Sequence, residues 1–318
     1  MERFLKSKFK IGNKLGENYF SLTYNGTTLL NDSPVIIKIY KRGTLTSNLI
    51  QAMKQKVRIL QGQIHLRIVP LLDGDYGWQG FYYVRNFIQG KPLREIIKER
   101  SLSFPDVEKY ILEICEALSA AHERGIVHGA LSENNIFVDK DGIKIVDFII
   151  EGEIKESLPQ KALLILDNDE TLSPEEISGK QAAFSSDIFA VGVLFYKMLS
   201  FQSPFKGQID KLRGRFIPLN QAPRYQQDII AKALNPDPLL RFKNIYELAE
   251  SLKHKTLANH RVEMDLPPIE LENAPHPEEN IVRVIKKEQE KSFFLAFVVL
   301  LAALAGIIYA VITSILAR

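Results

Sequence analysis

The sequence predicts an α+β fold in which a β-rich N-terminal part precedes a helical part, with a hydrophobic helix near the C-terminal end. Strand-like runs rich in β-branched residues begin at residue 9, and longer amphipathic runs follow from residue 105. Residues 293–317 carry no charge. The composition, with 318 residues, 46% hydrophobic and 25% charged, is that of an ordinary globular chain. A net charge of +3 is too small to indicate a nucleic-acid partner.

Strands are expected first along the chain. The stretches FKIGNKL, FSLTYNGTTLL and SPVIIKIY alternate and are rich in β-branched and aromatic residues. Two further strands are expected within HLRIVPLLDGDYGWQGFYYVRNFIQGKPLREII. The turn after the first stretch contains Gly16, Asn18 and Ser21. Because asparagine tolerates a left-handed backbone and serine is small, this turn can close a hairpin, and taken alone it indicates no more than that.

Helices are expected next. The run SNLIQAMKQKVRILQGQ predicts one over residues 47–63, and a long amphipathic run predicts another over Pro105–Arg124, ending at Gly125. Further helices are expected at YKMLS, PRYQQDIIAKAL and IYELAESLK. Cys115 is the single cysteine, which fits a reducing compartment, and we interpret it as a small buried hydrophobic residue. The N-terminus lacks the continuous apolar core of a signal peptide.

The stretch Ile126–Phe148 reads IVHGALSENNIFVDKDGIKIVDF, two apolar strand-like runs around a polar loop. It resembles the catalytic loop and metal-binding segment of the eukaryotic-type Ser/Thr protein kinases, whose loop reads His-Arg-Asp-Leu-Lys-Pro-Glu-Asn. The resemblance covers roughly Phe9 to Lys255. It implies a bilobal protein-kinase-like fold over residues 9–255, with a small lobe of about 9–88 and a large lobe of about 89–255, after an N-terminal extension of residues 1–8.

In this resemblance the groups that transfer phosphate are missing. Ala130 stands where the family has the aspartate that accepts the proton of the substrate hydroxyl, and Ser132 stands where it has the loop lysine. A methyl group can neither accept a proton nor orient a hydroxyl. The two positions that hold magnesium are kept, as Asn135 and Asp147. Gly129 replaces the arginine that in many kinases reads a phosphorylated activation segment. The pattern is that of a degenerate, pseudokinase-like member.

The resemblance also implies a nucleotide site for ATP. In active kinases the strand lysine, here Lys38, contacts the α- and β-phosphates and is held by a helix glutamate. No aspartate or glutamate lies between Asp32 and Asp73, and Lys56 falls at the expected glutamate position. Lys38 is therefore expected either to stay available for phosphate or to pair with Asp147 in a closed, inactive arrangement. The candidate nucleotide-binding residues come from the turn, the strand and the hinge at residues 84–87, and are Gly16, Ser21, Lys38, Asn86 and Phe87.

Other matches are structural. Ser-Pro-Glu at residues 173–175 matches the family's Ala-Pro-Glu, and Arg241 matches the arginine that pairs with that glutamate. Asp187 is expected to hold the backbone of the catalytic loop, and His128 is expected to brace the same loop. The predicted structural residues are thus His128, Glu175, Asp187 and Arg241.

The C-terminal part is expected to reach a membrane. Residues 256–291 are polar and rich in proline, which predicts a cytoplasmic linker. Residues 292–317 are predicted to form a transmembrane helix, because a helix of 25 uncharged residues spans roughly 37 Å. Lys286, Lys287 and Lys291 precede it and only Arg318 follows, so the kinase-like part is expected in the cytoplasm. A small-residue stripe in this helix could support a homodimer, and consists of Ala302, Gly306, Ala310 and Ser314.

Three functions remain open from the sequence. The first is a membrane-anchored pseudokinase that acts as a scaffolding or regulatory module for a cytoplasmic protein partner, with or without bound nucleotide. The second is a weakly active Ser/Thr kinase that uses ATP and magnesium with a non-standard loop. The third is a switch that senses ATP without transferring phosphate. Binding of ATP with magnesium and phosphate transfer are the two measurements that separate them.

Overall fold

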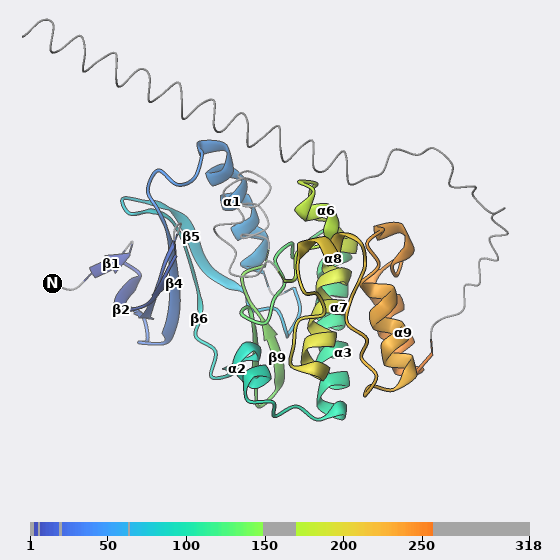
Figure 1. The fold of residues 1–318 in the computed structure, drawn as a ribbon. Helices are drawn as coiled ribbons and strands as arrows, with labels where there is room; N and C mark the ends of the chain where they lie inside the picture. Colours follow the sequence, from blue (N-terminus) through green and yellow to red (C-terminus); the bar gives the residue numbers. More distant parts are fainter. Residues whose placement is uncertain (1–2, 6, 19–20, 63, 149–169, 257–318) are drawn as a thin grey trace, which may run out of the picture. The chain divides into compact units, whose positions relative to one another are not determined.

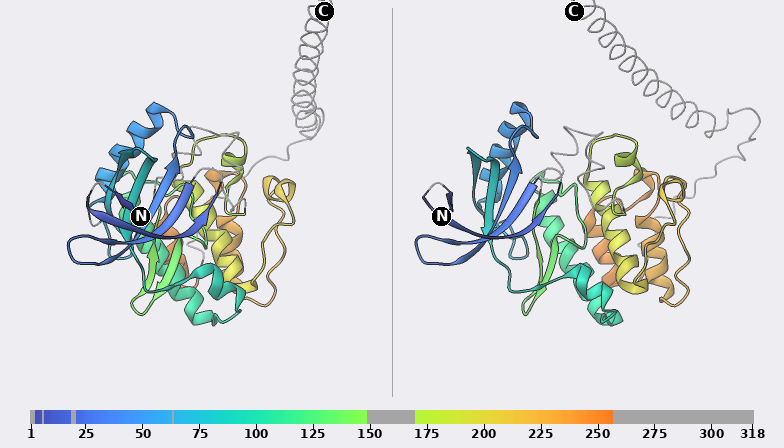
Figure 2. Two further views of the ribbon diagram at one scale, coloured as in Figure 1. Left: turned by 90° about the vertical axis from the view of Figure 1, so that its left-hand side faces the viewer. Right: turned by 60° about the vertical axis from the view of Figure 1, so that its left-hand side comes forward.

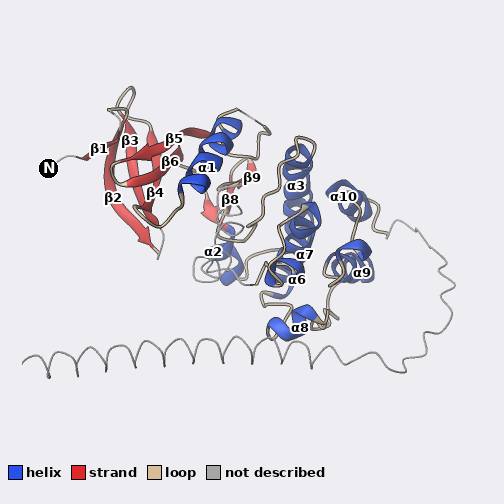
Figure 3. Cartoon of the chain, turned by 90° about the horizontal axis from the view of Figure 1, so that it is seen from above, coloured by secondary structure: helices blue, strands red, loops and turns tan. Residues whose placement is uncertain are grey.

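The computed structural model describes residues 3–5, 7–18, 21–62, 64–148 and 170–256. In this part of the chain a β-rich lobe is followed by a helical lobe, as Figures 1 and 3 show. Figure 2 presents the two lobes from two other sides. This is the bilobal α+β arrangement that the resemblance implied. By its contacts the chain divides into two units, residues 1–260 and residues 261–318, and the second unit lies outside the described residues.

The predicted membrane segment is not among the described residues. Within the described ranges no helix combines the length and the apolar character needed to cross a bilayer. The linker beyond Thr256, the helix of residues 292–317 and its stripe at Ala302, Gly306, Ala310 and Ser314 all lie outside those ranges. They remain predictions.

The small lobe is built on a six-stranded antiparallel sheet in the order β1-β2-β3-β4-β6-β5. All the strands predicted for this lobe are present. The short N-terminal strand was not predicted, because three residues are too few to show an alternating pattern. The strands are β1 (Arg3–Leu5), β2 (Phe9–Glu17), β3 (Ser21–Thr28), β4 (Pro34–Lys41), β5 (Leu71–Gly77) and β6 (Gly80–Asn86).

Helix α1 (Ser47–Leu60) lies against this sheet. The Thr46 side chain caps it by accepting from the backbone N–H of Leu49, and an apolar stripe of the helix is buried. A Cβ at Gly74 of β5 would lie 2.8 Å from a methyl carbon of Val57, so the close approach of helix and strand requires glycine there. The helix ends at residue 60 rather than at the predicted residue 63, because glycine at position 62 disfavours helix.

The large lobe is organised around α7 (Phe184–Ser200), in which every residue from Ser186 to Leu199 is buried. A helix buried on all sides belongs in the centre of a core. Helix α3 (Phe104–His122), predicted from residue 105 to 124, and α9 (Arg224–Ala233) both contact it. The remaining helices are α2 (Leu93–Lys98), α6 (Pro174–Ile177), α8 (Gln208–Leu212), the 3₁₀ turn Pro238–Leu240 and α10 (Ile245–Lys253). Cys115 on α3 is buried, as predicted, and burial raises the pKa of its thiol.

A second, three-stranded sheet in the large lobe carries the catalytic-loop region. Its strands β7 (Lys91–Pro92), β8 (Ile136–Asp139) and β9 (Gly142–Ile145) pair in that order. The polar loop that resembles the catalytic loop precedes β8, and Asp147 follows β9 by two residues. The pairing of β8 with β9 brings the end of this loop next to the segment of Asp147, where the N–H of Val146 donates to the carbonyl of Asn135 at 2.9 Å.

The segment between α1 and β5 joins the lobes through backbone contacts. The N–H of Ile145 donates to the carbonyl of Arg67 at 2.7 Å, and the N–H of Val69 donates to the carbonyl of Ile145 at 3.0 Å. The Arg67 guanidinium also pairs with the Glu113 carboxylate of α3 at 2.8 Å. Gly142 has φ +111°, and a Cβ there would lie 2.5 Å from both of these charged groups, so this junction too depends on glycine.

Candidate functional site

Asp147 is the centre of a group of polar side chains between the lobes. It adopts a left-handed backbone conformation with φ +62°, which is uncommon for a residue other than glycine. The Tyr83 hydroxyl donates to Oδ1 at 2.6 Å, and Nζ of Lys38 lies 3.6 Å from Oδ2. Nε of Arg85 lies 3.7 Å from Oδ1. Of the two arrangements predicted for Lys38, the structure thus has the one in which it pairs with Asp147.

The charges around Asp147 keep its carboxylate ionised. Burial acts to raise the pKa of Asp147, but the positive charges of Lys38 and Arg85 and the hydrogen bond from Tyr83 outweigh it. The pKa therefore lies below its usual value. Since Tyr83 and Arg85 both belong to β6 and Lys38 to β4, the small lobe supplies all three of these groups to a residue of the large lobe.

The loop before β8 is braced from within by Asn135. Its Nδ2 donates to the carbonyl of Ala130 at 2.8 Å, and its Oδ1 accepts from the backbone N–H of Ser132 at 2.8 Å. Asn135 is 3% exposed, and Ser132 is buried. The oxygen that the resemblance assigns to magnesium is thus engaged with the loop backbone.

Asp187 at the start of α7 holds the same loop from outside. Its carboxylate accepts from the backbone N–H of His128 at 2.8 Å and from that of Gly129 at 3.0 Å. Its Oδ2 also lies 2.8 Å from Nε2 of His122. The ring of His128 packs against Phe148, with ring centroids 4.4 Å apart. Both residues therefore have the contacts expected of supports for the loop.

Glu175 and Arg241 form a buried ion pair in the large lobe. The guanidinium donates to both carboxylate oxygens, at 2.8 and 2.7 Å. The Arg241 side chain has no exposed surface, and it also donates to the carbonyls of Ser185, Asn235 and Pro236. Two segments far apart in the sequence are joined in this way.

The space beside Ala130 is lined by two carboxylates among the described residues. A hollow of about 10 Å³, room for about one water molecule, touches Ala130, Glu176 and Asp187. Glu176 accepts from the N–H and hydroxyl of Ser173 at 3.0 and 2.8 Å, in the box that caps α6. Asp187 is committed to the loop backbone. Each carboxylate lining the hollow is thus already engaged in a structural role.

Arg85 is the residue of this region whose placement sequence reasoning missed. We expected residues 84–87 to form a hinge, but Val84 and Arg85 continue β6 and pair with Ile37 and Ile36 of β4. The Arg85 side chain is 8% exposed, and its Nη1 donates to the carbonyl of Asn86 at 3.2 Å. Its guanidinium carbon lies 5.6 Å from the ring centroid of Phe137. The sequence feature that could have indicated this position is the arginine directly after the apolar run 81–84.

The other predicted nucleotide-binding residues lie on the turn and at the end of β6. Ser21 donates through its N–H and its hydroxyl to Oδ1 of Asn18, at 2.7 and 3.0 Å, so the turn is closed by its own side chains. A Cβ at Gly16 would meet nothing within 4 Å, so glycine is not required there by packing. The N–H of Phe87 donates to the carbonyl of Pro34 at 3.1 Å. Lys56 is half-buried on α1, a helix without acidic residues.

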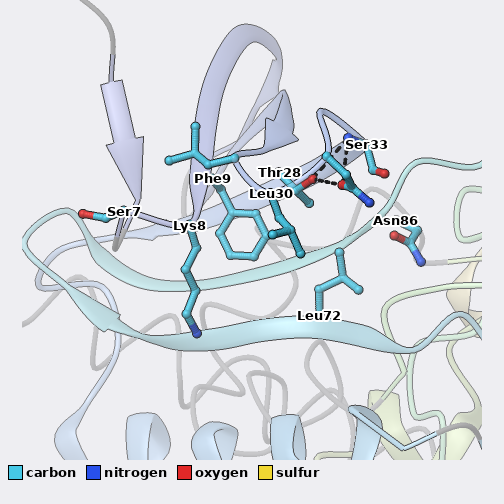
Figure 4. A pocket seen from close by; sticks show the side chains of 10 residues that line it. Ser7, Lys8, Phe9, Thr28, Leu30, Ser33, Leu72 and Asn86 are labelled. Atoms are coloured by element: carbon cyan, nitrogen blue, oxygen red, sulfur yellow. Dashed lines mark hydrogen bonds between the residues drawn. The ribbon is translucent and has the colours of Figure 1, made fainter.

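A separate hollow opens on the small lobe, at the junction of β2, β3 and β5, and Figure 4 shows its lining. Its volume is about 590 Å³, and its walls include the apolar side chains of Phe9, Leu30 and Leu72. Lys8 on its rim pairs with Asp73 at 3.2 Å. Within the described residues, no group of three or more metal-ligating side chains is present here or elsewhere.

Known proteins resemble this chain over most of its length. Residues 9–257 match the family model described as a protein kinase domain. The probable serine/threonine-protein kinase PknB of Lactococcus lactis is 26% identical over 279 residues, which are 83% of this chain and 44% of that protein. The serine/threonine-protein kinase PrkC of Bacillus subtilis is 25% identical over 264 residues, which are 78% of this chain and 40% of that protein. The chain thus spans less than half the length of these relatives.

Proposed function

Since this chain belongs to the protein kinase family, we propose that it is a member that binds a protein partner without transferring phosphate. The observation that carries this proposal is the position of Ala130 in the loop. Ala130 is buried and offers only a methyl group, and the two carboxylates that line the hollow beside it are held by Ser173 and by the loop backbone. We therefore assign no general base for a substrate hydroxyl to the residues that line this hollow.

The cost of this loss is large. A positioned general base typically contributes about 10²- to 10⁴-fold to the rate of a proton-transfer step. The family's loop aspartate also orients the hydroxyl for in-line attack, which a methyl group cannot do. The structural contacts that the resemblance implied are present, with Asp187 bonded to the backbone of the loop and Glu175 paired with Arg241. These contacts together with a loop that lacks the aspartate suit a binding or scaffolding role in signalling or assembly.

The test is transfer from radiolabelled ATP, with magnesium, to the chain itself and to a generic protein substrate. We expect no transfer above that of Asp147→Ala, which removes the remaining metal-binding carboxylate. Transfer by the natural chain that Asp147→Ala abolishes would overturn the proposal. If the natural chain does transfer phosphate, Glu176→Gln tests whether Glu176 replaces the missing base. Loss of transfer in this variant would give Glu176 that role.

Restoring the missing aspartate should not restore transfer. Ala130→Asp supplies the general base, but α1 still lacks an acidic residue to hold Lys38 away from Asp147. We therefore expect Ala130→Asp to remain inactive in the same assay. Recovery of transfer by this single change would mean that the rest of the site is competent.

ATP and magnesium are the cofactors of the reaction that this family performs, and they would supply the transferred phosphate and its charge neutralisation. Asn135 and Asp147 offer the oxygen ligands that magnesium prefers. As arranged here, however, Asn135 is engaged by Ser132, and Asp147 is engaged by Lys38, Arg85 and Tyr83. The cleft as it stands does not fit the pair, and a nucleotide would first have to displace these contacts.

A weakly active Ser/Thr kinase is the second candidate. It is supported by the names of the similar proteins, which are serine/threonine-protein kinases. An ATP-sensing switch is a third, in which nucleotide would change lobe closure alone. A thermal shift with ATP and magnesium that disappears in Lys38→Ala favours the third candidate when no transfer accompanies it.

We also propose that the chain is anchored in a membrane, with its kinase domain in the cytoplasm. The support is the uncharged run 293–317, flanked by three lysines before it and one arginine after it. A homodimer through the stripe at Ala302 and Gly306 would follow from the same helix. Retention of the chain in membranes after carbonate washing supports the anchor, and release into the wash contradicts it.

A further inference from the structure

The position of the Arg85 side chain is not explained by a structural role in its strand. Its side chain leaves β6 at the last residue but one and turns inward, where it is 8% exposed. It contacts three groups: the carbonyl of Asn86, the ring of Phe137 and the carboxylate of Asp147. We propose that the Arg85 side chain fills the part of the cleft that would bind the adenine base. Arg85 thereby excludes the adenine ring and decides whether this site takes a nucleotide.

The backbone groups that would recognise a base already have partners within the chain. The residues that follow β6 join the lobes, and an adenine amino group needs a free backbone carbonyl there as its acceptor. The carbonyl of Asn86 already accepts from Nη1 of Arg85 at 3.2 Å. The neighbouring N–H, that of Phe87, donates to Pro34 at 3.1 Å. Both backbone groups predicted to recognise the base are therefore satisfied within the chain.

The ring of Phe137 lies close to the same guanidinium. Phe137 of β8 offers its ring to the Arg85 guanidinium, with 5.6 Å between the guanidinium carbon and the ring centroid. A planar guanidinium stacks on an aromatic face much as a heterocyclic base does. The same guanidinium therefore donates to the carbonyl of Asn86 and lies over the ring of Phe137, two groups that a bound purine would use.

The positive charge of Arg85 also lies close to Asp147. Nε of Arg85 lies 3.7 Å from Oδ1 of Asp147, and Lys38 lies 3.6 Å from Oδ2. Two cations thus flank a carboxylate that would need its oxygens for a divalent cation. A buried arginine in a purely structural role would also satisfy Asp147. That role predicts lower stability on its removal and no change in affinity for a base.

The inference rests on the proposed function only in taking this cleft as the nucleotide site of the family. The test uses the purified full chain, in detergent because of the run 293–317, and the fluorescent analogue mant-ATP with magnesium. Arg85→Met replaces the guanidinium with an unbranched apolar side chain. We expect it to bind mant-ATP about tenfold more tightly or better than the natural chain, because a hydrogen bond to a charged donor no longer has to be broken.

Two further ligands locate the effect. Adenosine, which has the base but no phosphate, should compete for mant-ATP more strongly in Arg85→Met than in the natural chain. Tripolyphosphate, which has no base, should compete equally or more weakly, since the variant has lost a positive charge. A gain seen with tripolyphosphate and not with adenosine would overturn the inference.

Controls keep the result decisive. Arg224→Met removes the same charge from a side chain that is 83% exposed on α9, and it should leave mant-ATP affinity unchanged. If circular dichroism shows Arg85→Met to be unfolded, Arg85→Lys takes its place, because an ammonium keeps the charge near Asp147 but lacks the planar stack. Equal affinity, within threefold, of the natural chain and the folded Arg85 variant overturns the inference. Phosphate transfer by the natural chain would instead overturn the proposed function. The inference about Arg85 would still be decided by the ratio of mant-ATP affinities between the Arg85 variant and the natural chain.

Discussion

Removing the charge of Glu175 should destabilise the large lobe strongly. Glu175→Gln keeps the size of the side chain but leaves the Arg241 guanidinium, which has no exposed surface, without its counter-charge. Breaking a buried ion pair from one side typically costs about 3–5 kcal/mol. Arg241 keeps its bonds to the carbonyls of Ser185 and Asn235, both at 2.8 Å, so the lower end of that range is expected.

The expected loss can be measured in two ways. A decrease of about 3 kcal/mol in the free energy of unfolding corresponds to a fall of roughly 6–12 °C in melting temperature for a domain of this size. Denaturant unfolding of the full chain in detergent, followed by far-ultraviolet circular dichroism, gives the first quantity. Replacing both partners, as Glu175→Gln with Arg241→Met, removes the stranded charge and should cost less than Glu175→Gln alone.

The pH dependence provides an internal check. Burial acts to raise the pKa of Glu175, but the hydrogen bond and charge of Arg241 outweigh it, so the pKa lies below the ordinary 4.5. The ionised pair therefore contributes stability above about pH 4.5, and this contribution is lost as the pH falls through the folded pKa. The difference between the natural chain and Glu175→Gln should narrow on acidification. A difference below about 1 kcal/mol at neutral pH, well under the usual cost of breaking a buried pair, would refute the reasoning.

Three further outcomes are expected. Lys38 and a neighbouring arginine outweigh burial and lower the pKa of Asp147 below 3.8, so Asp147→Asn should reduce the fall in the free energy of unfolding below about pH 4. The same fall in the variant and the natural chain, measured by denaturant titration at acid pH, would contradict this. Gly142→Ala should cost more than about 2 kcal/mol, because φ is +111° and a Cβ would lie 2.5 Å from two charged groups, whereas Gly207→Ala, with open space around it, should be nearly neutral. Burial acts to lower the pKa of Lys197, but two glutamates outweigh it, so the pKa lies above the ordinary 10.5. The stability that the charged lysine contributes should therefore be lost only above about pH 10.5, and Lys197→Met should lack this alkaline step in thermal melts.

Local patterns were sufficient for most elements of the fold. Alternation and β-branched residues predicted the three strands between Phe9 and Lys41, and apolar periodicity predicted α3 to within two residues at each end. The pairing of Glu175 with Arg241 could not come from periodicity, because the two residues meet only through the tertiary fold. It followed from the resemblance to a known family, and the structure has the pair.

The contacts of the cleft were harder to foresee. Every residue of β6 from Phe81 to Arg85 is buried, so alternation gives no sign of which face a side chain takes. Tyr83 was predicted to lie in a strand, and it does, but its hydroxyl also reaches Asp147, which the sequence did not indicate. Arg85 was read as a hinge residue, and its direction depends on groups more than 50 residues away, Phe137 and Asp147.

The backbone bridge between residues 67–69 and Ile145 ties the segment after α1 to the part of the large lobe that carries Asp147. Its two hydrogen bonds, of 2.7 and 3.0 Å, lie two residues before that carboxylate. Nζ of Lys38 approaches the same carboxylate at 3.6 Å from β4. The position of Asp147 therefore depends on the backbone of residues 67–69 as well as on the side chains that contact it.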